Sequence, residues 1–443
     1  MILLVKGSQY MRVDTIVSGK VFIYDRIVEA SFAIKDGKIV TLGKNLSNIT
    51  CEKRLEFNGP YVILPGMVDI HVHMRDLEQS YKEDWLSGST AAVAGGITLV
   101  VDMPNTKPPT NNLQVLKEKI EIARSKSVVD FGFYFGVPNS IEELEEAFKY
   151  GIFGLKIYPN DYEKPLVSYM KECTENGKIT VVHPESPEFL CDSEISDRHS
   201  KIRPPEAEVR AVESFVDIAL RHGLRIHFTH ISLASSLFNI LKAKIRGGRV
   251  SCDVTPHHLF LNLSKEEELG YLSKVNPPLR SEENQMLLYN AFKRFLIDAY
   301  ITDHAPHLME EKMSSVYEEV PPGFPGLEIA LPLLINEIVQ DNFPLQIINL
   351  YSFYPAKLLN ISKGIMGIGF DADFSIVNYK KEWVIKGEHF KSKAKYTPFE
   401  GKKIRGQITQ TYIRGKNVYE EDCITVKPGY GQLITPNQIA ELK

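Results

Sequence analysis

Eight short apolar segments alternate with eight longer amphipathic segments between residues 67 and 338. The short segments predict strands, because they are rich in branched and aromatic side chains. They cover residues 67–72, 98–102, 129–135, 154–158, 180–183, 225–228, 250–254 and 299–302. The longer segments predict helices at residues 84–94, 113–123, 141–149, 166–175, 206–221, 233–245, 282–295 and 327–338. This succession predicts an α/β fold, a parallel (β/α)8 barrel of the TIM type.

Both ends of the chain have a different sequence pattern, in which apolar and polar residues alternate in short runs. Residues 35–38 form a hairpin signal, and residues 373–379 and 407–413 precede a turn at 414–417. We therefore expect the two termini to build one small β-sandwich together. A chain of 443 residues is also longer than a single core usually supports. The predicted domains are residues 1–64 (sandwich), 65–355 (barrel) and 356–443 (sandwich and tail).

The composition excludes several function classes. A net charge of −4 offers no basic surface for nucleic acid or for an acidic membrane. The five cysteines are scattered without a C-x-x-C pair, which favours a reducing compartment over a disulfide framework. The opening residues are too short for a signal peptide, and no run of eighteen apolar residues occurs. We expect a soluble cytoplasmic protein that acts on a small molecule.

His71 and His73 lie two positions apart at the end of the first predicted strand. Side chains two apart in a strand share a face, so these imidazoles can converge on one metal ion. Helical metal sites space their histidines four apart instead. The alternative is a pair of half-buried surface histidines.

Further polar residues lie at the carboxyl ends of other barrel strands, where TIM barrels carry their chemistry. These are Lys156, His183, His230 and Asp303. Each alone is compatible with a barrel-rim side chain. Together with His71 and His73, they predict a metal site at one mouth of the barrel.

The strand pleat separates the remaining histidines. We expect His227 and His304 to turn away from the mouth, because they are out of step with the residues assigned to it. Three others are predicted to be solvated: His199, His222 and His389. His257 and His258 leave two alternatives open, orientation of ligands and simple packing.

Lys156 is unusual because an ammonium cannot bind a metal. Burial lowers the pKa of a lysine, and a neutral amine beside two dications can take up carbon dioxide to form a bridging carbamate. The alternative is an ion pair between Lys156 and Asp303 with no metal. Two metals would lower the pKa of a shared hydroxide and polarise a carbonyl, and Asp303 would then move protons to a leaving nitrogen. The predicted chemistry is hydrolysis of an amide, or its reverse.

The chain resembles the dihydroorotase family of the amidohydrolase superfamily, most closely the dihydroorotase domain of the multifunctional animal pyrimidine enzyme. The similar blocks run almost end to end, at residues 69–75, 103–106, 154–158, 256–260, 276–278, 303–307, 321–328, 397–401 and 428–432. The resemblance implies reversible cyclisation of N-carbamoyl-L-aspartate to L-dihydroorotate with loss of water. This is the third step of pyrimidine synthesis.

The resemblance also implies the roles of individual residues. One zinc would be held by His71, His73, Lys156 and Asp303, and a second by Lys156, His183 and His230. Lys156 would be carboxylated (N6-carboxylysine) and would bridge the two ions together with a hydroxide, with Asp303 as the catalytic residue. Substrate contacts carry over as His73, Arg75, Asn105, Asn276, His307, Pro322 and Gly323. Independently, Arg75 lies two past His73, and its guanidinium suits a ring carboxylate.

One position departs from the animal pattern. Thr229 stands where those domains have a cysteine associated with an additional metal, so two metals only are inferred. The polar stretch 262–274 is equally compatible with a mobile lid and with a static loop.

Rival functions remain on the same scaffold. Dihydropyrimidinase, hydantoinase and allantoinase would share the metals but would not need Arg75, Asn105 and His307 together. A metal-free scaffold relative that docks aspartate transcarbamoylase is a further alternative. A homodimer and an association with aspartate transcarbamoylase are left open as partners.

Overall fold

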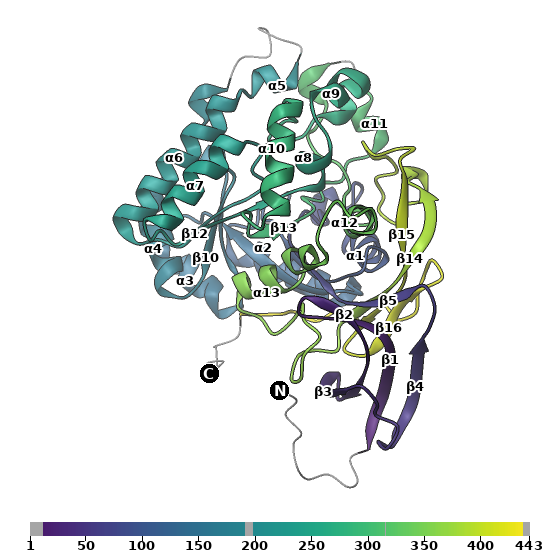
Figure 1. Cartoon of the computed structure of the whole chain (residues 1–443). Helices are drawn as coiled ribbons and strands as arrows, with labels where there is room; N and C mark the ends of the chain where they lie inside the picture. Colours follow the sequence, from purple (N-terminus) through teal and green to yellow (C-terminus); the bar gives the residue numbers. More distant parts are fainter. Residues whose placement is uncertain (1–11, 191–197, 315, 437–443) are drawn as a thin grey trace.

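The computed structural model describes residues 12–190, 198–314 and 316–436, and its centre is an eight-stranded parallel sheet (Figure 1). The strands follow one another in sequence order: β6 (Met67–Val72), β7 (Ile97–Asp102), β8 (Asp130–Gly136), β9 (Gly154–Ile157), β10 (Ile179–Val182), β11 (Ile226–Phe228), β12 (Val250–Val254) and β13 (Ala299–Tyr300). A parallel bridge between Val72 and His304 brings the last strand back to the first. All eight predicted strands and the (β/α)8 fold class are confirmed.

Helices surround this barrel as predicted. The eight confirmed helices are α1 (Trp85–Ala94), α2 (Leu113–Lys126), α3 (Ile141–Lys149), α4 (Leu166–Glu175), α6 (Pro205–His222), α7 (Ala234–Ile245), α10 (Glu282–Lys293) and α12 (Ala330–Val339). Their ends carry recognisable stop and start signals. The Asp84 carboxylate accepts hydrogen bonds from the first turn of α1, and Gly223 ends α6 with a φ of 66°.

Short helices at the ends of the strands were not predicted. They are α5 (His199–Ile202), α8 (Pro256–Phe260), α9 (Leu263–Leu269), α11 (Met309–Lys312) and α13 (Phe353–Leu359). Segments this short contain too few periodic positions to be recognised in a sequence. The stretch 262–274, for which lid and static loop were both open, forms α9 and the 3-10 turn η5 (Gly270–Ser273).

Both termini join in a second sheet, which confirms a shared β module. Its strands are β1 (Val13–Ile23), β2 (Arg26–Lys35), β3 (Lys38–Gly43), β4 (Cys51–Phe57), β5 (Tyr61–Pro65), β14 (Phe374–Val384), β15 (Lys403–Ile413), β16 (Lys416–Glu420) and β17 (Cys423–Ile424). They form one continuous hydrogen-bonded sheet, in which β5 pairs antiparallel with β14. The purple and yellow strands of Figure 1 therefore lie side by side.

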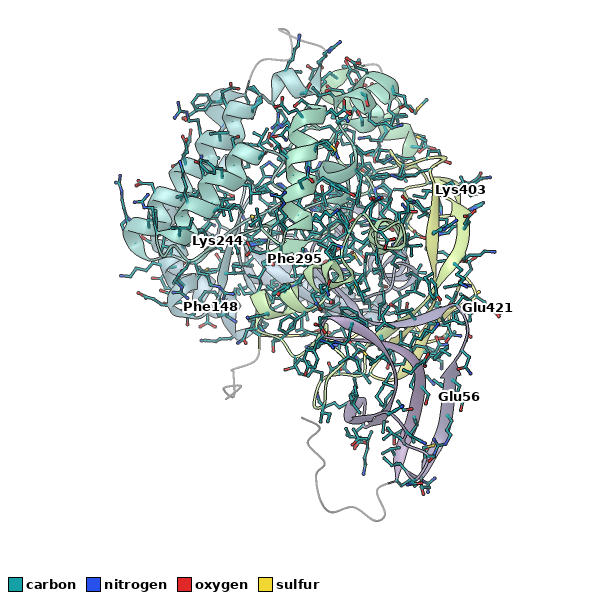
Figure 2. The ribbon with its side chains drawn as sticks, viewed as in Figure 1. Glu56, Phe148, Lys244, Phe295, Lys403 and Glu421 are labelled. Carbon is teal, nitrogen blue, oxygen red and sulfur yellow. The ribbon has the colours of Figure 1, made fainter. Side chains whose placement is uncertain are left out.

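Apolar side chains fill the barrel and the layer beneath its helices. Leu99, Val101 and Tyr134 belong to the inner cluster, whereas Val100 and Phe133 pack in the outer one. Charged residues such as Glu56, Lys403 and Glu421 lie at the periphery (Figure 2). In the described ranges, no helix is long and apolar enough to cross a bilayer. Four cysteines are free thiols, and Cys191 lies outside the described residues, as does the chain opening at residues 1–11.

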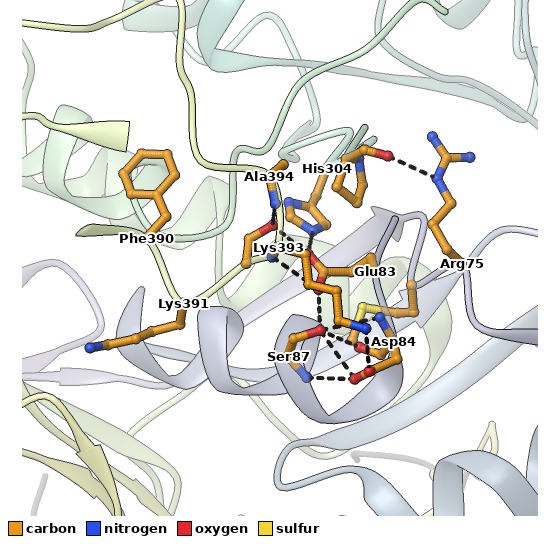
Figure 3. A network of polar contacts seen from close by, with 12 residues as sticks. Arg75, Glu83, Asp84, Ser87, His304, Phe390, Lys391, Lys393 and Ala394 are labelled. Carbon is orange, nitrogen blue, oxygen red and sulfur yellow. Dashed lines mark hydrogen bonds and ion pairs between the residues drawn. The ribbon is translucent and has the colours of Figure 1, made fainter. Parts of the chain in front are cut away.

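The C-terminal sheet reaches the barrel mouth through the loop at residues 390–396. The Tyr396 hydroxyl donates to Gly323 O at 3.0 Å. Ser392 donates to the Glu83 carboxylate, and Lys393 Nζ pairs with Asp84 at 2.6 Å. Figure 3 shows this network beside His304. The second sheet is thus connected by hydrogen bonds and an ion pair to loops that surround the predicted site.

Candidate active site at the barrel mouth

The six side chains predicted at the strand ends lie at one end of the barrel. They follow or close their strands as predicted: His71 and His73 at β6, Lys156 in β9, His183 after β10, His230 after β11 and Asp303 after β13. The four histidines and Asp303 line one cavity of about 750 Å³, and Lys156 is fully buried.

The distances show a compact group. The Asp303 Oδ1 atom lies 3.3 Å from His71 Nε2 and 3.0 Å from His73 Nε2. The imidazole of His230 has its ring centroid 5.1 Å from that of His71 and 4.6 Å from that of His183. Ligand atoms of His71, His230 and Asp303 all fall within 4.8 Å of one another, a spacing that one ion can bridge.

The proton on His71 can be placed from its neighbours. The Thr229 hydroxyl donates to the Asp253 carboxylate at 3.1 Å, so its oxygen must accept from His71 Nδ1. Burial lowers the pKa of His71 well below its usual value, so the ring is neutral and carries one proton. The Nε2 atom therefore presents a lone pair toward Asp303.

His73 reaches the same state through Asn105. Its Nδ1 donates to the Asn105 side-chain oxygen at 2.7 Å, and burial lowers its pKa well below the usual value. When Asp303 is ionised, two imidazole lone pairs and a carboxylate oxygen thus face each other without a proton between them. This arrangement is repulsive alone and favourable around a cation, so the residues present fit a metal ion.

Three more donors complete the set. Lys156 Nζ and His230 Nδ1 are buried without a hydrogen-bond partner among the described residues. His183 Nε2 lies 2.7 Å from the Glu185 carboxylate, and donation there leaves Nδ1 free to bind a metal. Burial alone would raise the pKa of Glu185, but Arg203 and His183 outweigh it and keep that pKa below its usual value.

Lys156 and Asp303 both have displaced pKa values. Burial lowers the pKa of Lys156 to about 7, which makes the neutral amine available near neutral pH. Burial likewise raises the pKa of Asp303 to about 7. The alternative of a hydrogen-bonded Lys156–Asp303 ion pair is not formed, because Lys156 Nζ has no partner in the described part of the chain.

The backbone at the mouth is held in an unusual conformation. Arg75, His230 and Asp303 have φ values of 55°, 40° and 46°, in the left-handed region that non-glycine residues rarely adopt. Such conformations cost on the order of 1 kcal/mol each and persist where the surroundings enforce them. At His230, the backbone N–H donates to Asp253, which also binds His227 and Thr229.

Two predictions about other histidines were wrong. His227 does not face the helices: its Nε2 lies 2.7 Å from Asp253, on the inner side that also holds Thr229. The pleat argument failed because β11 ends at Phe228 and the positive φ of His230 breaks the alternation. His199 is not solvated but only 5% exposed, whereas His304 does turn away and lies 3.5 Å from Glu83 (Figure 3).

The predicted substrate contacts all line the same cavity. They are His73, Arg75, Asn105, Asn276, His307, Pro322 and Gly323. Arg75 Nη2 lies 3.1 Å from His307 Nε2, and Arg75 Nε donates to Pro306 O at 3.3 Å (Figure 3). Lys82 Nζ lies 3.1 Å from His307 Nδ1, and Pro322 O lies 3.1 Å from His307 Nε2. A buried guanidinium therefore lies on the same cavity as the metal-binding set.

Several residues of the site were missed by sequence reasoning. Tyr158 lines the cavity with its hydroxyl buried and unpartnered among the described residues. Glu185, Arg203 and Asp253 orient the histidines from behind. Only Glu185 had a local signal, since it lies only two residues past His183.

Comparisons with known proteins identify the family of the chain. The model of the Amidohydrolase family matches residues 62–418. A dihydroorotase of Pyrococcus furiosus is 37% identical over 94% of this chain and 95% of its own length, and one of Methanosarcina mazei is 34% identical over 94% and 96%. An L-hydantoinase structure from Arthrobacter aurescens superposes with a TM-score of 0.89 at 27% identity, covering 96% of this chain and 100% of that one. The chain belongs to the amidohydrolase family.

Proposed function

We propose that this chain is a dihydroorotase, which interconverts N-carbamoyl-L-aspartate and L-dihydroorotate in the third step of pyrimidine synthesis. The observation that carries this proposal is a buried arginine, Arg75, on the same cavity as the imidazoles and Asp303. A ring that bears a carboxylate needs such a cation, because bidentate pairing with a guanidinium supplies both charge and geometry. Archaeal relatives named dihydroorotase, 34–37% identical, support the same substrate.

The cofactor in this proposal is a pair of zinc ions. His71, His73 and Asp303 would hold one ion, His183 and His230 the other, and carboxylated Lys156 both. When bound, two such ions lower the pKa of a shared water and polarise the carbonyl under attack. The neutral amine favoured at Lys156 is the form that combines with carbon dioxide, giving a carbamate and releasing a proton.

The protein's own groups bind the substrate and move its protons. Arg75, with Asn105 and His307 beside it, orients the carboxylate. In the hydrolytic direction, water oxygen adds to the ring amide carbonyl and the carbon–nitrogen bond breaks. The Asp303 carboxylate takes the proton from water and gives it to the leaving nitrogen. Cyclisation runs these steps in reverse and releases water.

Substrate choice tests the proposal against dihydropyrimidinase, hydantoinase and allantoinase. We expect the wild type to hydrolyse dihydroorotate far faster than dihydrouracil. Arg75→Ala should lower kcat/KM for dihydroorotate by about a hundredfold, since a charged hydrogen-bond pair is lost. Turnover of uncharged rings should change little. Initial rates on both substrates measure this, with the exposed Arg221→Ala as the matched control. A wild-type preference for dihydrouracil would contradict the assignment.

Metal content tests the cofactor and the scaffold alternative together. Protein purified without chelator should contain two divalent ions per chain. Mass spectrometry of the peptide containing Lys156 should show the added mass of one carbon dioxide under conditions that preserve carbamates. A metal-free protein that still cyclises N-carbamoyl-L-aspartate would refute the proposed metal cofactor. The domain division, a cytoplasmic location, a homodimer and an aspartate transcarbamoylase partner rest on sequence or resemblance and stay predictions.

A further inference from the structure

A chain of four side chains runs along the cavity wall that contains Asn276. It begins at Lys274, passes through Tyr317 in η6 (Tyr317–Glu319) and His199 in α5, and ends at Asn276. His199 Nδ1 lies 2.7 Å from the Tyr317 hydroxyl. His199 Nε2 lies 2.9 Å from Asn276 Oδ1 and 2.8 Å from Val275 O. His199 itself does not line the cavity, whereas Val275 and Asn276 do.

The proton positions in this chain follow from its acceptors. The carbonyl of Val275 can only accept, so His199 Nε2 must carry the proton that lies between them. The Asn276 atom facing the same N–H must then be its oxygen, because an amide nitrogen there would oppose one donor to another. The tautomer of His199 therefore decides which way the Asn276 amide points.

The other side of His199 supports the same tautomer. Burial lowers the pKa of His199 to about 3, so the ring is neutral and its Nδ1 accepts from the Tyr317 hydroxyl. Lys274 holds Tyr317 in turn, since its Nζ donates to Tyr317 O at 2.7 Å and lies 3.6 Å from the ring centroid. The ring of Tyr317 is thereby fixed against His199.

The Asn276 oxygen is engaged by His199, and Asn276 lines the cavity with its NH2 group as the remaining polar end. That group donates to no other residue in the described ranges. A fixed NH2 group favours ligands that place a carbonyl or carboxylate oxygen at this point, and it disfavours ligands that place an N–H there.

We propose that His199 is a positioning residue that locks Asn276 with its amide NH2 group toward the substrate, with Val275 O fixing the tautomer and the Tyr317 hydroxyl supporting it. The inference rests on the proposed function for its substrate. It assigns this wall to an oxygen acceptor of dihydroorotate or of N-carbamoyl-L-aspartate.

Steady-state kinetics with a double variant tests the inference. His199→Phe keeps an aromatic ring and removes the hydrogen bonds to Tyr317, Val275 and Asn276, so KM for dihydroorotate should rise about tenfold while kcat and metal content stay near wild type. His199→Gln, which restores a donor, should recover part of this loss. The double variant His199→Phe/Asn276→Ala should have the same KM for dihydroorotate as Asn276→Ala alone, because both substitutions act through the Asn276 amide. Fully additive losses would overturn the proposal.

One further variant serves as a control and another as a second test. His389→Phe makes the same substitution at an exposed site and should leave KM unchanged. Tyr317→Phe removes only the hydroxyl, so it keeps the proposal testable if His199→Phe fails to fold. It should raise KM by about threefold, and an unchanged KM would contradict the role of Tyr317.

Nitrogen NMR of histidine-labelled protein separates this inference from the proposed function. The signal that disappears in His199→Gln should be that of a neutral ring protonated at Nε2. A ring protonated at Nδ1 would overturn the positioning role even in an active enzyme. A wild type inactive on dihydroorotate, but with the Nε2 tautomer present, would overturn the substrate assignment and leave the orientation of Asn276 standing.

Discussion

Asp303→Ala is expected to lower kcat for dihydroorotate by at least about a thousandfold while the barrel stays folded. The change removes a proton carrier, worth about a hundredfold to ten-thousandfold, together with the oxygen that lies 3.0 Å from His73. The fold should survive because removal of the carboxylate also relieves its burial and its contact with two imidazole lone pairs. Steady-state kinetics and far-UV circular dichroism measure the two effects.

Two other variants define what the loss means. Asp303→Asn keeps the shape but cannot accept a proton, so it should be nearly as inactive as Asp303→Ala. Asp217→Ala, at an exposed position of α6, should leave kcat unchanged. Appreciable turnover by Asp303→Asn would show that another group moves the proton.

Lys156→Met is expected to have opposite effects on activity and on stability. The variant should lose at least one metal ion and about a thousandfold in kcat, because no bridging carbamate can form. In chelator-treated protein it should melt at a higher temperature than the wild type. A buried amine without a partner costs about 1–3 kcal/mol, and methionine removes that cost at similar volume. Metal analysis, kinetics and thermal unfolding with and without chelator measure these effects.

Lys119→Met is the matched control for that experiment. Lys119 is as buried as Lys156, but its Nζ lies 2.6 Å from the Asp102 carboxylate. Its removal leaves a buried carboxylate unpaired, so this variant should be destabilised by about 3–5 kcal/mol. A chelator-treated Lys156→Met protein that is destabilised to the same degree would mean that Lys156 is a structural lysine.

The hydrogen-bond network around Glu83 connects the second, antiparallel sheet to residues near the active-site cavity. Glu83 accepts from Ser392 of the C-terminal loop and lies 3.5 Å from His304, the neighbour of Asp303 in sequence. The Tyr396 hydroxyl holds Gly323 on the substrate wall. The block 397–401, which carries part of the family resemblance, therefore comes directly after Tyr396, a residue that contacts the cavity lining.

Local pattern was sufficient for the barrel and for the residues that converge in it. Each strand is short, apolar and bounded by polar turns, and a parallel barrel places every strand's carboxyl end at one mouth. His71, Lys156 and Asp303 could therefore be assigned to one site from their positions at strand ends. Their ligand chemistry followed from residue type.

Alternation along a strand failed where the strand stopped being regular. His227 was predicted on the outer face because it lies three residues before His230. The φ of 40° at His230 interrupts the regular alternation of side chains, so that prediction failed. That angle is enforced by Asp253, which comes from the neighbouring strand β12. No pattern local to residues 227–230 contains this information.

The amino-acid sequence by itself determined the barrel, the shared β module of the two termini and the set of groups at the mouth, because these depend on periodicity and residue type. Only the tertiary structure decided which nitrogen of His71, His73 and His199 carries the proton, that His199 is buried against Asn276, and that Glu185, Arg203 and Asp253 orient the histidines. The physical reason is that a proton's position depends on hydrogen-bond partners that lie far away in sequence, such as Val275 for His199. Such pairs are set by the packing of whole elements, which no local stretch of the chain specifies.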